Sequence, residues 1–167
     1  MNQRMYLKFY DKRQTLIIIL FLLYLVSVLT VTFIVRETMV LRTSENRGVV
    51  IQPFREFEAM VNGTHFFWFK QIFLNVLLFV LFGVLLPMVS RYFKNPMVTG
   101  ITGCLFSVFI EIMQYITSRG LTEVDDVITN TIGVAVGVLI YRLVSAVYRS
   151  TVHAQYKNKP LQFYLLK

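Results

Sequence analysis

The sequence predicts an all-α membrane protein with four transmembrane helices in an antiparallel bundle and a short interfacial helix between the first two. Of its 167 residues, 56 % are hydrophobic, and the mean hydropathy is +0.60, both above ordinary soluble usage. Four mainly apolar stretches reach the roughly 20 residues that a helix needs to cross a bilayer. Short connections join the last three stretches, so those helices are expected to be antiparallel neighbours.

The first stretch follows a basic N-terminus, residues 1–14, which is predicted to be cytoplasmic. Residues 15–35 carry no charge and are longer than the apolar core of a secretory signal peptide. Because no small-x-small cleavage pattern follows them, we interpret this stretch as an uncleaved first transmembrane helix.

An extracytoplasmic segment, residues 36–69, is predicted to connect the first and second spans. A connection of this length is unusual in a compact domain and is usually functional or disordered. Pro53 suits the first turn of a helix, so a short helix is expected over residues 54–60. Phe54 and Phe57 would dip into the membrane interface.

Residues 70–148 are predicted to form a core of three transmembrane helices, at about 71–90, 97–117 and 127–148. Only the middle one of these has a charge well inside it, at Glu111. Residues 149–167 are interpreted as a basic cytoplasmic tail on the membrane surface.

The distribution of Lys and Arg predicts that both termini are cytoplasmic, because cytoplasmic loops carry an excess of these residues. The cytoplasmic segments of this topology contain Arg4, Lys8, Lys12, Arg13, Arg91, Lys94, Arg142, Arg149, Lys157, Lys159 and Lys167. The outer segments contain fewer, namely Arg36, Arg42, Arg47, Arg55 and Arg119. The window 118–126, between the last two spans, therefore faces outward.

The net charge of +8 does not indicate a nucleic-acid partner, because the basic residues flank the spans. The predicted partner is the lipid bilayer, whose anionic inner leaflet attracts such residues. Cys104, the single cysteine, lies within a span, which excludes an intrachain disulfide and a Cys-based metal site. No cofactor and no metal are predicted, and the oligomeric state is left open.

Polar and small residues align on one face of each core span, because residues three or four apart share a helix face. In span 97–117 this face contains Gly100, Gly103, Ser107, Glu111 and Gln114. In span 127–148 and the residue before it, the face contains Asp126, Asn130, Gly133, Gly137 and Tyr141, and in span 71–90 it contains Asn75, Phe79, Gly83 and Pro87. For Gly83, Gly100, Gly103, Gly133 and Gly137 we favour close helix packing.

The polar members of these faces fall in one layer near the outer surface. At about 1.5 Å per residue, Asn75, Gln114 and Asn130 lie roughly 5 Å below the outer boundary and Glu111 about 9 Å below it. A carboxylate in lipid is costly, so Glu111 should face the bundle interior or a polar pocket, with Asn75 and Asn130 as first partners. Arg119 is expected to meet Asp125 or Asp126.

Asp125 and Asp126 have two readings that the sequence leaves open. Both lie at the start of the last helix, where carboxylates cap free backbone N–H groups. They are also candidate ligand-binding residues at the rim of an outward-opening pocket.

These residues resemble the motifs of the VanZ-like family of bacterial membrane proteins over about residues 50–141. The resemblance is carried by Gln52-Pro53-Phe54, by the run from Asn75 through Gly83 to Pro87, and by Glu111, Gln114, Arg119, Glu123, Asp125, Asp126, Asn130, Gly133 and Gly137. This chain departs from the family pattern at Leu81, where a proline is usual, at Val50, where an asparagine is usual, and at Glu123, which is often aspartate.

The resemblance implies a multi-pass protein of the cytoplasmic membrane, mostly from Gram-positive bacteria, whose named member supports low-level resistance to teicoplanin-type glycopeptide antibiotics. It implies no established reaction. Its motif positions fall here on Asn75, Gly83, Glu111, Gln114, Arg119, Asp125, Asp126 and Asn130.

Two functions of different classes remain. The first is a non-enzymatic envelope protein whose polar pocket binds or masks a cell-wall precursor, a lipid headgroup or a glycopeptide-related ligand. Its binding residues would be Asn75, Glu111, Gln114, Arg119, Asp125, Asp126 and Asn130. The second is a membrane enzyme that modifies a lipid-linked or peptidoglycan substrate, with Glu111, Asp125 and Asp126 as candidate acids and bases.

Overall fold

The computed structural model describes residues 3–35, 49–63, 65–117 and 122–157. In chain order, its elements are α1 (Gln3–Thr30), the π-helical turn η1 (Val31–Val35), β1 (Val49–Val50), α3 (Arg55–Asn62), α4 (His65–Val89), the 3₁₀ turn η3 (Arg91–Lys94), α5 (Pro96–Thr117), β2 (Thr122–Glu123) and α6 (Val124–Lys157).

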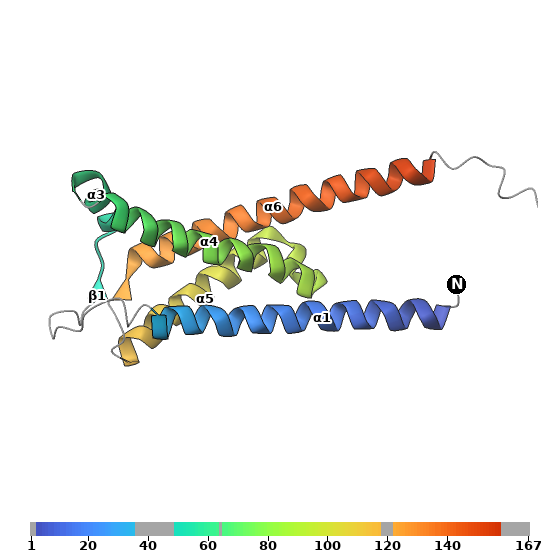
Figure 1. The fold of residues 1–167 in the computed structure, drawn as a ribbon, viewed down its shortest axis with the longest axis horizontal. Coiled ribbons are helices and arrows are strands. Elements are labelled where there is room, and N and C mark those ends of the chain that lie inside the picture. Colours follow the sequence, from blue (N-terminus) through green and yellow to red (C-terminus); the bar gives the residue numbers. More distant parts are fainter. Residues whose placement is uncertain (1–2, 36–48, 64, 118–121, 158–167) are drawn as a thin grey trace, which may run out of the picture.

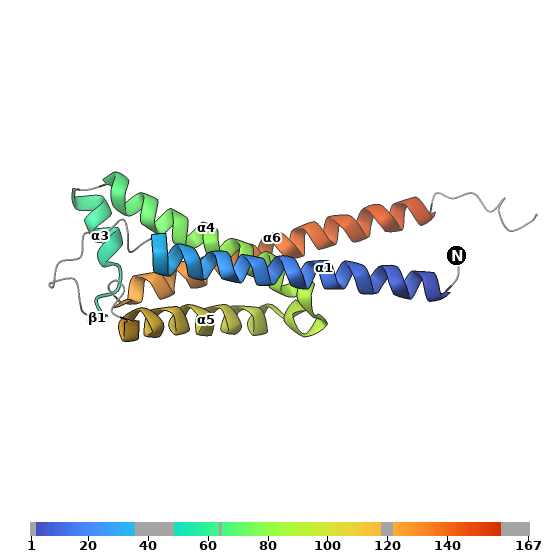
Figure 2. The ribbon, with the colours of Figure 1, turned by 60° about the horizontal axis from the view of Figure 1, so that its bottom comes forward.

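The predicted all-α membrane fold is confirmed. Within the described residues, four helices are long and apolar enough to cross a membrane, at Lys12–Phe33, Phe69–Val89, Pro96–Thr117 and Val124–Ala154. They run side by side as an elongated bundle (Figures 1 and 2). The short helix α3, predicted over residues 54–60, is observed at Arg55–Asn62.

Two of the helices continue well past the predicted spans. α1 begins at Gln3 and α6 extends to Lys157, because neither extension contains the Gly or Pro that would end a helix. Figure 1 shows the start of α1 and the end of α6 at the same end of the bundle, opposite α3 and β1. The bundle therefore has a terminal end and an opposite end, which we call the strand end.

The closest contact in the bundle is the crossing of α4 and α6. A Cβ added at Gly137 would lie 2.9 Å from the Gly83 Cα atom, and one added at Gly133 would lie 2.9 Å from the Phe79 Cβ atom. Real Cβ atoms do not approach other atoms so closely, so glycine is required at these positions for the backbones to meet. Gly83, Gly133 and Gly137, which the sequence analysis assigned to helix packing, all lie at this crossing.

The glycines of α5 behave differently from one another. A Cβ at Gly103 would lie 2.5 Å from Val134 Cγ2, whereas a Cβ at Gly100 would have nothing within 4 Å. The prediction that Gly100 mediates packing is therefore wrong, because its helix face turns away from the neighbouring helices. Thr99, which is fully buried, takes the inward position instead and donates to the Phe93 carbonyl oxygen at 2.6 Å.

Aromatic side chains fill the space beside the glycine crossing. Phe82 of α4 stacks on Phe106 of α5 with ring centroids 5.4 Å apart, and Phe21 of α1 packs against Phe82 at 5.7 Å. Tyr24 of α1 donates its hydroxyl proton to the Leu78 carbonyl oxygen at 2.7 Å. α1 is thus attached to the bundle through α4, and many of its described apolar side chains, such as Leu16, Leu23 and Val26, are exposed on the bundle surface.

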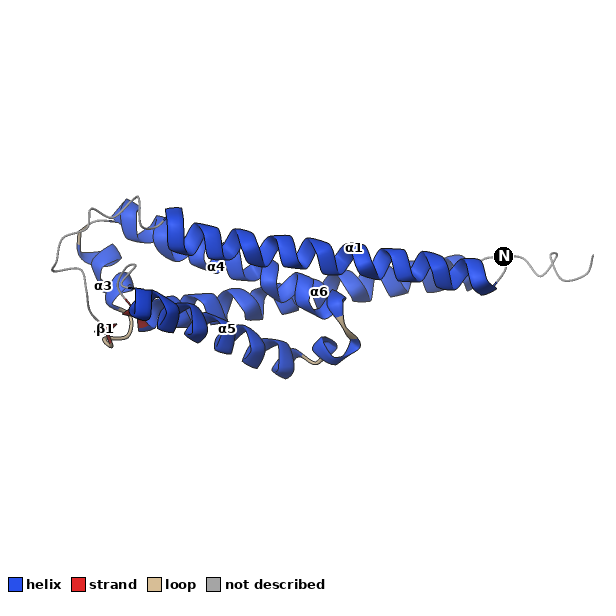
Figure 3. Cartoon of the chain, turned by 90° about the horizontal axis from the view of Figure 1, so that it is seen from below, coloured by secondary structure: helices blue, strands red, loops and turns tan. Residues whose placement is uncertain are grey.

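Two short strands at the strand end were not predicted. β1 and β2 pair in parallel, with Val49 opposite Thr122 and Val50 opposite Glu123 (Figure 3). Two-residue strands leave no periodic pattern in a sequence. Their pairing joins the connection after α1 to the connection before α6.

We expect Gly137→Ala to lower the free energy of unfolding by about 1–3 kcal/mol, because the added methyl group would be forced against α4. Gly100→Ala is the matched control and should be neutral or stabilising, since alanine favours helix and the site is open. Reversible unfolding in mixed micelles with increasing SDS measures both. Equal stability of the two variants would show that the α4–α6 crossing tolerates a side chain.

Candidate functional site: a buried acidic cluster

Acidic side chains gather at the strand end, where α3, α5, β2 and the start of α6 meet. They are Glu56, Glu111, Glu123, Asp125 and Asp126, and each is at most 5 % exposed. Burying a carboxylate is expensive unless it is hydrogen-bonded or paired with a cation. The hydrogen bonds of these groups therefore decide what the cluster does.

Glu111 joins α5 to β2. The Glu123 backbone N–H donates to Glu111 Oε2 at 2.9 Å, and the Thr122 hydroxyl donates to the Glu111 carbonyl oxygen at 3.3 Å. With its amide nitrogen facing the carboxylate, Gln114 donates to both Glu111 oxygens at 3.2 Å. The prediction that Glu111 faces the bundle interior is confirmed.

The first partners predicted for Glu111 were wrong. Asn75 donates instead to Asp126 Oδ1 at 2.6 Å, and Asn130 donates to the Ser107 hydroxyl at 2.9 Å. Asn130 Oδ1 is a buried acceptor with no hydrogen-bond partner in the described part of the chain. The polar residues do lie in one layer, but each asparagine forms its hydrogen bond with the helix that it faces directly: Asn75 of α4 with α6, and Asn130 of α6 with α5.

Asp125 holds the interfacial helix α3. Its Oδ1 accepts from the Phe54 backbone N–H at 2.5 Å, and its Oδ2 accepts from the Glu56 backbone N–H at 2.8 Å. One donor belongs to the residue just before α3 and the other to its first turn, where backbone N–H groups lack partners within the helix. Asp125 thus caps α3 across the structure, in place of the predicted capping of its own helix.

α4 provides amide side chains to two members of the cluster. Asn75 bonds Asp126, and Gln71, one turn earlier, donates to Glu56 Oε1 at 2.5 Å. One face of α4 therefore positions an acid from α3 and an acid from α6 next to each other.

One arginine that the sequence analysis did not place at the site, Arg55, lies beside the cluster. Arg55 Nη1 lies 3.4 Å from Glu123 Oε1, and the Arg55 side chain is 42 % exposed, so this ion pair contributes little to stability. Arg119, which was predicted to meet Asp125 or Asp126, lies outside the described residues.

Three of the carboxylates are close enough to share a cation. Oxygen atoms of Glu56, Glu123 and Asp126 all lie within 4.8 Å of one another. Carboxylate oxygens are the preferred ligands of Mg²⁺ and Ca²⁺. The sequence analysis predicted no metal ligands, and this grouping arises only because α3 folds back over the start of α6.

A small cavity adjoins the cluster between α3, α4 and α6. Its volume is about 180 Å³, and its walls include Glu56 and Asp125 together with Phe57, Ile72 and Ile132. A water molecule occupies about 30 Å³ in the liquid. The volume therefore suits a small chemical group, but the exposed lining is nearly all apolar. The Glu56 and Asp125 carboxylates at its edge already accept hydrogen bonds from Gln71 and from α3.

The sequence analysis missed Glu56 and Gln71 as site residues and placed Glu123 only in a family motif. Glu56 lies on a short helix whose phenylalanines predicted contact with lipid. The sequence pattern does not show which other helix packs against the face of this helix that contains Glu56. Gln71 is a single polar residue at the predicted start of a span, where polar residues are ordinary. Both positions depend on contacts between distant segments.

The fold and the site define a multi-pass all-α membrane protein with a buried acidic cluster at one end of its bundle. The chain belongs to the VanZ/LLP1 family, whose sequence model matches residues 18–145. The resemblance drawn from its motifs is thereby confirmed. Neither the comparison with curated proteins nor that with solved structures gave a match.

We expect Asp125→Ala to release α3. The substitution removes two hydrogen bonds to a charged acceptor, each contributing about 1.5–3 kcal/mol, so amide hydrogen exchange over residues 54–62 should accelerate at least about tenfold. Amide hydrogen exchange in the part of α4 that follows Asn75 should not change.

Glu58→Ala is the matched control for this experiment, because Glu58 is an exposed carboxylate on α3 itself. It should leave exchange in α3 near the wild-type rate. Unchanged protection of α3 in Asp125→Ala would mean that other contacts suffice to hold this helix.

Proposed function

We propose that this VanZ-like envelope protein supports resistance to teicoplanin-type glycopeptides by binding, without chemical change, an amine-bearing lipid headgroup or cell-wall precursor at its acidic cluster. The observation that carries the proposal is the burial of Glu56, Glu111, Glu123, Asp125 and Asp126 at one end of a membrane-spanning bundle. Ionisable residues are rare in membrane spans and usually mark a functional site.

The chemistry of the cluster supports a cationic or amide-bearing ligand. Carboxylates accept hydrogen bonds, and their bonds with ammonium donors are stronger than those between neutral groups. Asn130, itself 5 % exposed, has a side-chain oxygen with no partner among the described residues, and this oxygen adds a neutral acceptor one helical turn from Asp126. An anionic ligand would be repelled by the acidic groups of the cluster.

The size of the adjoining cavity limits which part of a precursor enters it. Pockets that enclose a drug-sized molecule usually measure about 300–1,000 Å³, whereas this one measures about 180 Å³. A terminal amine or a headgroup fits, and the rest of a precursor would lie along the exposed aromatic surface of α3 and α4, which includes Phe57, Phe66 and Phe69.

The location follows from the distribution of charge. The basic residues on the long ends of α1 and α6 support a cytoplasmic position for both termini. The acidic cluster at the strand end would then lie at the outer leaflet, where glycopeptides and mature wall precursors occur.

A membrane enzyme is the second candidate, and the close approach of the Glu56, Glu123 and Asp126 oxygens favours it. Such a triad could hold a divalent cation beside a substrate in a metal-assisted reaction. The two candidates differ in one observable: only an enzyme changes the covalent structure of a precursor or lipid.

Expression of the protein in a bacterium that lacks it should raise teicoplanin tolerance, and Glu111→Gln and Glu56→Gln should return tolerance to that of cells without the protein. Both substitutions keep the side-chain size but remove a buried charge that a cationic ligand requires. Susceptibility is measured together with the amount of protein in the membrane.

Glu58→Gln is the control, since it removes an exposed charge from the same helix as Glu56, and it should retain full tolerance. Mass spectrometry of wall precursors and lipids from the same cells decides between the candidates. An altered precursor or lipid mass that depends on Glu56 would contradict binding alone and establish the enzyme.

A further inference from the structure

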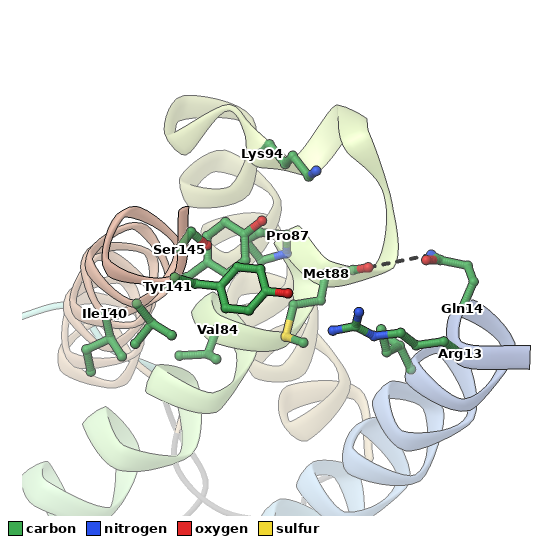
Figure 4. A pocket seen from close by; sticks show the side chains of 12 residues that line it. Arg13, Gln14, Val84, Pro87, Met88, Lys94, Ile140, Tyr141 and Ser145 are labelled. Carbon is green, nitrogen blue, oxygen red and sulfur yellow. Dashed lines mark hydrogen bonds between the residues drawn. The ribbon is translucent and has the colours of Figure 1, made fainter. Parts of the chain in front are cut away.

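A second cavity lies at the terminal end of the bundle, far from the acidic cluster along the helices. It measures about 490 Å³ and is lined by residues 13–17 of α1, the end of α4, Lys94 of η3 and residues 140–148 of α6 (Figure 4). This volume is within the range of sites that enclose a small organic molecule.

The cavity is divided into an apolar part and a basic rim. Ile17, Val84 and Val144 line the apolar part, and Arg13 and Lys94 contribute cations from two different elements. Figure 4 shows the Arg13 guanidinium pointing across the cavity toward Met88 and the Tyr141 hydroxyl, with Lys94 above them. Tyr141 and Ser145 add hydroxyl groups from α6.

Contacts between the surrounding elements keep the cavity open. The Gln14 side chain donates to the Val89 carbonyl oxygen, and its nitrogen lies 3.5 Å from the Met88 carbonyl oxygen, so α1 is fastened to the end of α4. α4 ends at Val89, whereas α6 continues to Lys157. The cavity lies between α1 and α6, beside the last turns of α4, which contribute Val84, Pro87 and Met88 to its lining.

The charge of the lining selects the ligand. Among the described residues that line this cavity there is no Asp or Glu, so a cationic ligand would meet only repulsion. Arg and Lys bind phosphate through charge-assisted hydrogen bonds, and the apolar walls require a hydrocarbon portion next to that phosphate. A free phosphate ion would leave those walls unfilled.

We propose that this cavity binds one anionic phospholipid from the leaflet at the terminal end of the bundle. The phosphate lies between Arg13 and Lys94, the hydroxyls of Tyr141 and Ser145 face the glycerol, and an acyl chain lies along Val84 and Val144. The site is independent of the acidic cluster and of the ligand proposed there.

Native mass spectrometry of the full-length protein in detergent, titrated with phosphatidylglycerol or phosphatidylcholine of identical acyl chains, tests this site. The wild type should bind one phosphatidylglycerol in preference to phosphatidylcholine. Arg13→Gln with Lys94→Gln should weaken phosphatidylglycerol binding at least about tenfold, because each cation near an anionic lipid contributes about 1 kcal/mol.

The matched control is Lys12→Gln with Arg91→Gln, which removes the same total charge from exposed positions on α1 and η3 that do not line the cavity. This control should change phosphatidylglycerol binding less than about twofold. Its charges are exposed, and dissolved salt screens their attraction for the lipid. An equal effect of the two double variants would show general attraction between charges and overturn the proposal.

A second pair of variants tests whether the lipid enters the cavity. Val144→Trp fills the cavity from α6, whereas Val147→Trp alters the same exposed helix outside it, and both valines are more than half exposed, at 63 % and 66 %. Only Val144→Trp should reduce phosphatidylglycerol binding. Equal binding by both tryptophan variants would place the lipid outside the cavity and overturn the proposal.

Soluble anions complete the test. Glycerol 3-phosphate and inorganic phosphate should not displace the bound lipid at millimolar concentrations, since they leave the apolar walls in water. Displacement by either would identify a site for soluble phosphates and overturn the lipid assignment, as would equal binding of phosphatidylcholine.

Discussion

The close crossing of α4 and α6 determines the arrangement of the rest of the molecule. In a bilayer, helices do not associate through the hydrophobic effect, so packing of backbone against backbone at Gly83, Gly133 and Gly137 is the main source of specificity. The crossing fixes the rotation of both helices. Asn75 is thereby directed at Asp126. Toward the terminal end, the last turns of α4 and the facing part of α6 form two walls of the second cavity.

The acidic cluster combines structural and chemical roles in the same side chains. Asp125 and Glu111 accept from backbone N–H groups of α3 and β2, so they hold the connections of the strand end in place. Glu56, Glu123 and Asp126 bring their oxygens together in the space that results. Carboxylates can serve in this way because an ionised group accepts several hydrogen bonds at once.

The sequence predicted the spans well because hydropathy depends only on local composition, and the glycines at 83, 103, 133 and 137 because small residues at helical spacing indicate packing. It did not distinguish Gly100 from Gly103, since helix rotation is set by neighbouring helices. The sequence also did not predict which hydrogen-bond partner each polar side chain has. Asn75 and Glu111 lie in one layer, yet their hydrogen bonds depend on the directions of the side chains. The strands and the docking of α3 join segments about 70 residues apart, which no local pattern records.

Phe54 adopts a left-handed conformation, with φ 64°, that costs a bulky residue of order 1 kcal/mol or more. The Asp125 carboxylate, which accepts from its N–H, holds it there. The start of α3 thus depends on Asp125, in addition to the contacts of Glu56 with Gln71 and of Arg55 with Glu123. A ligand that competes for the Asp125 carboxylate would loosen α3, and by reciprocity a firmly docked α3 weakens that ligand by the same factor. Any ligand that bound the Asp125 carboxylate would therefore be coupled to the docking of α3.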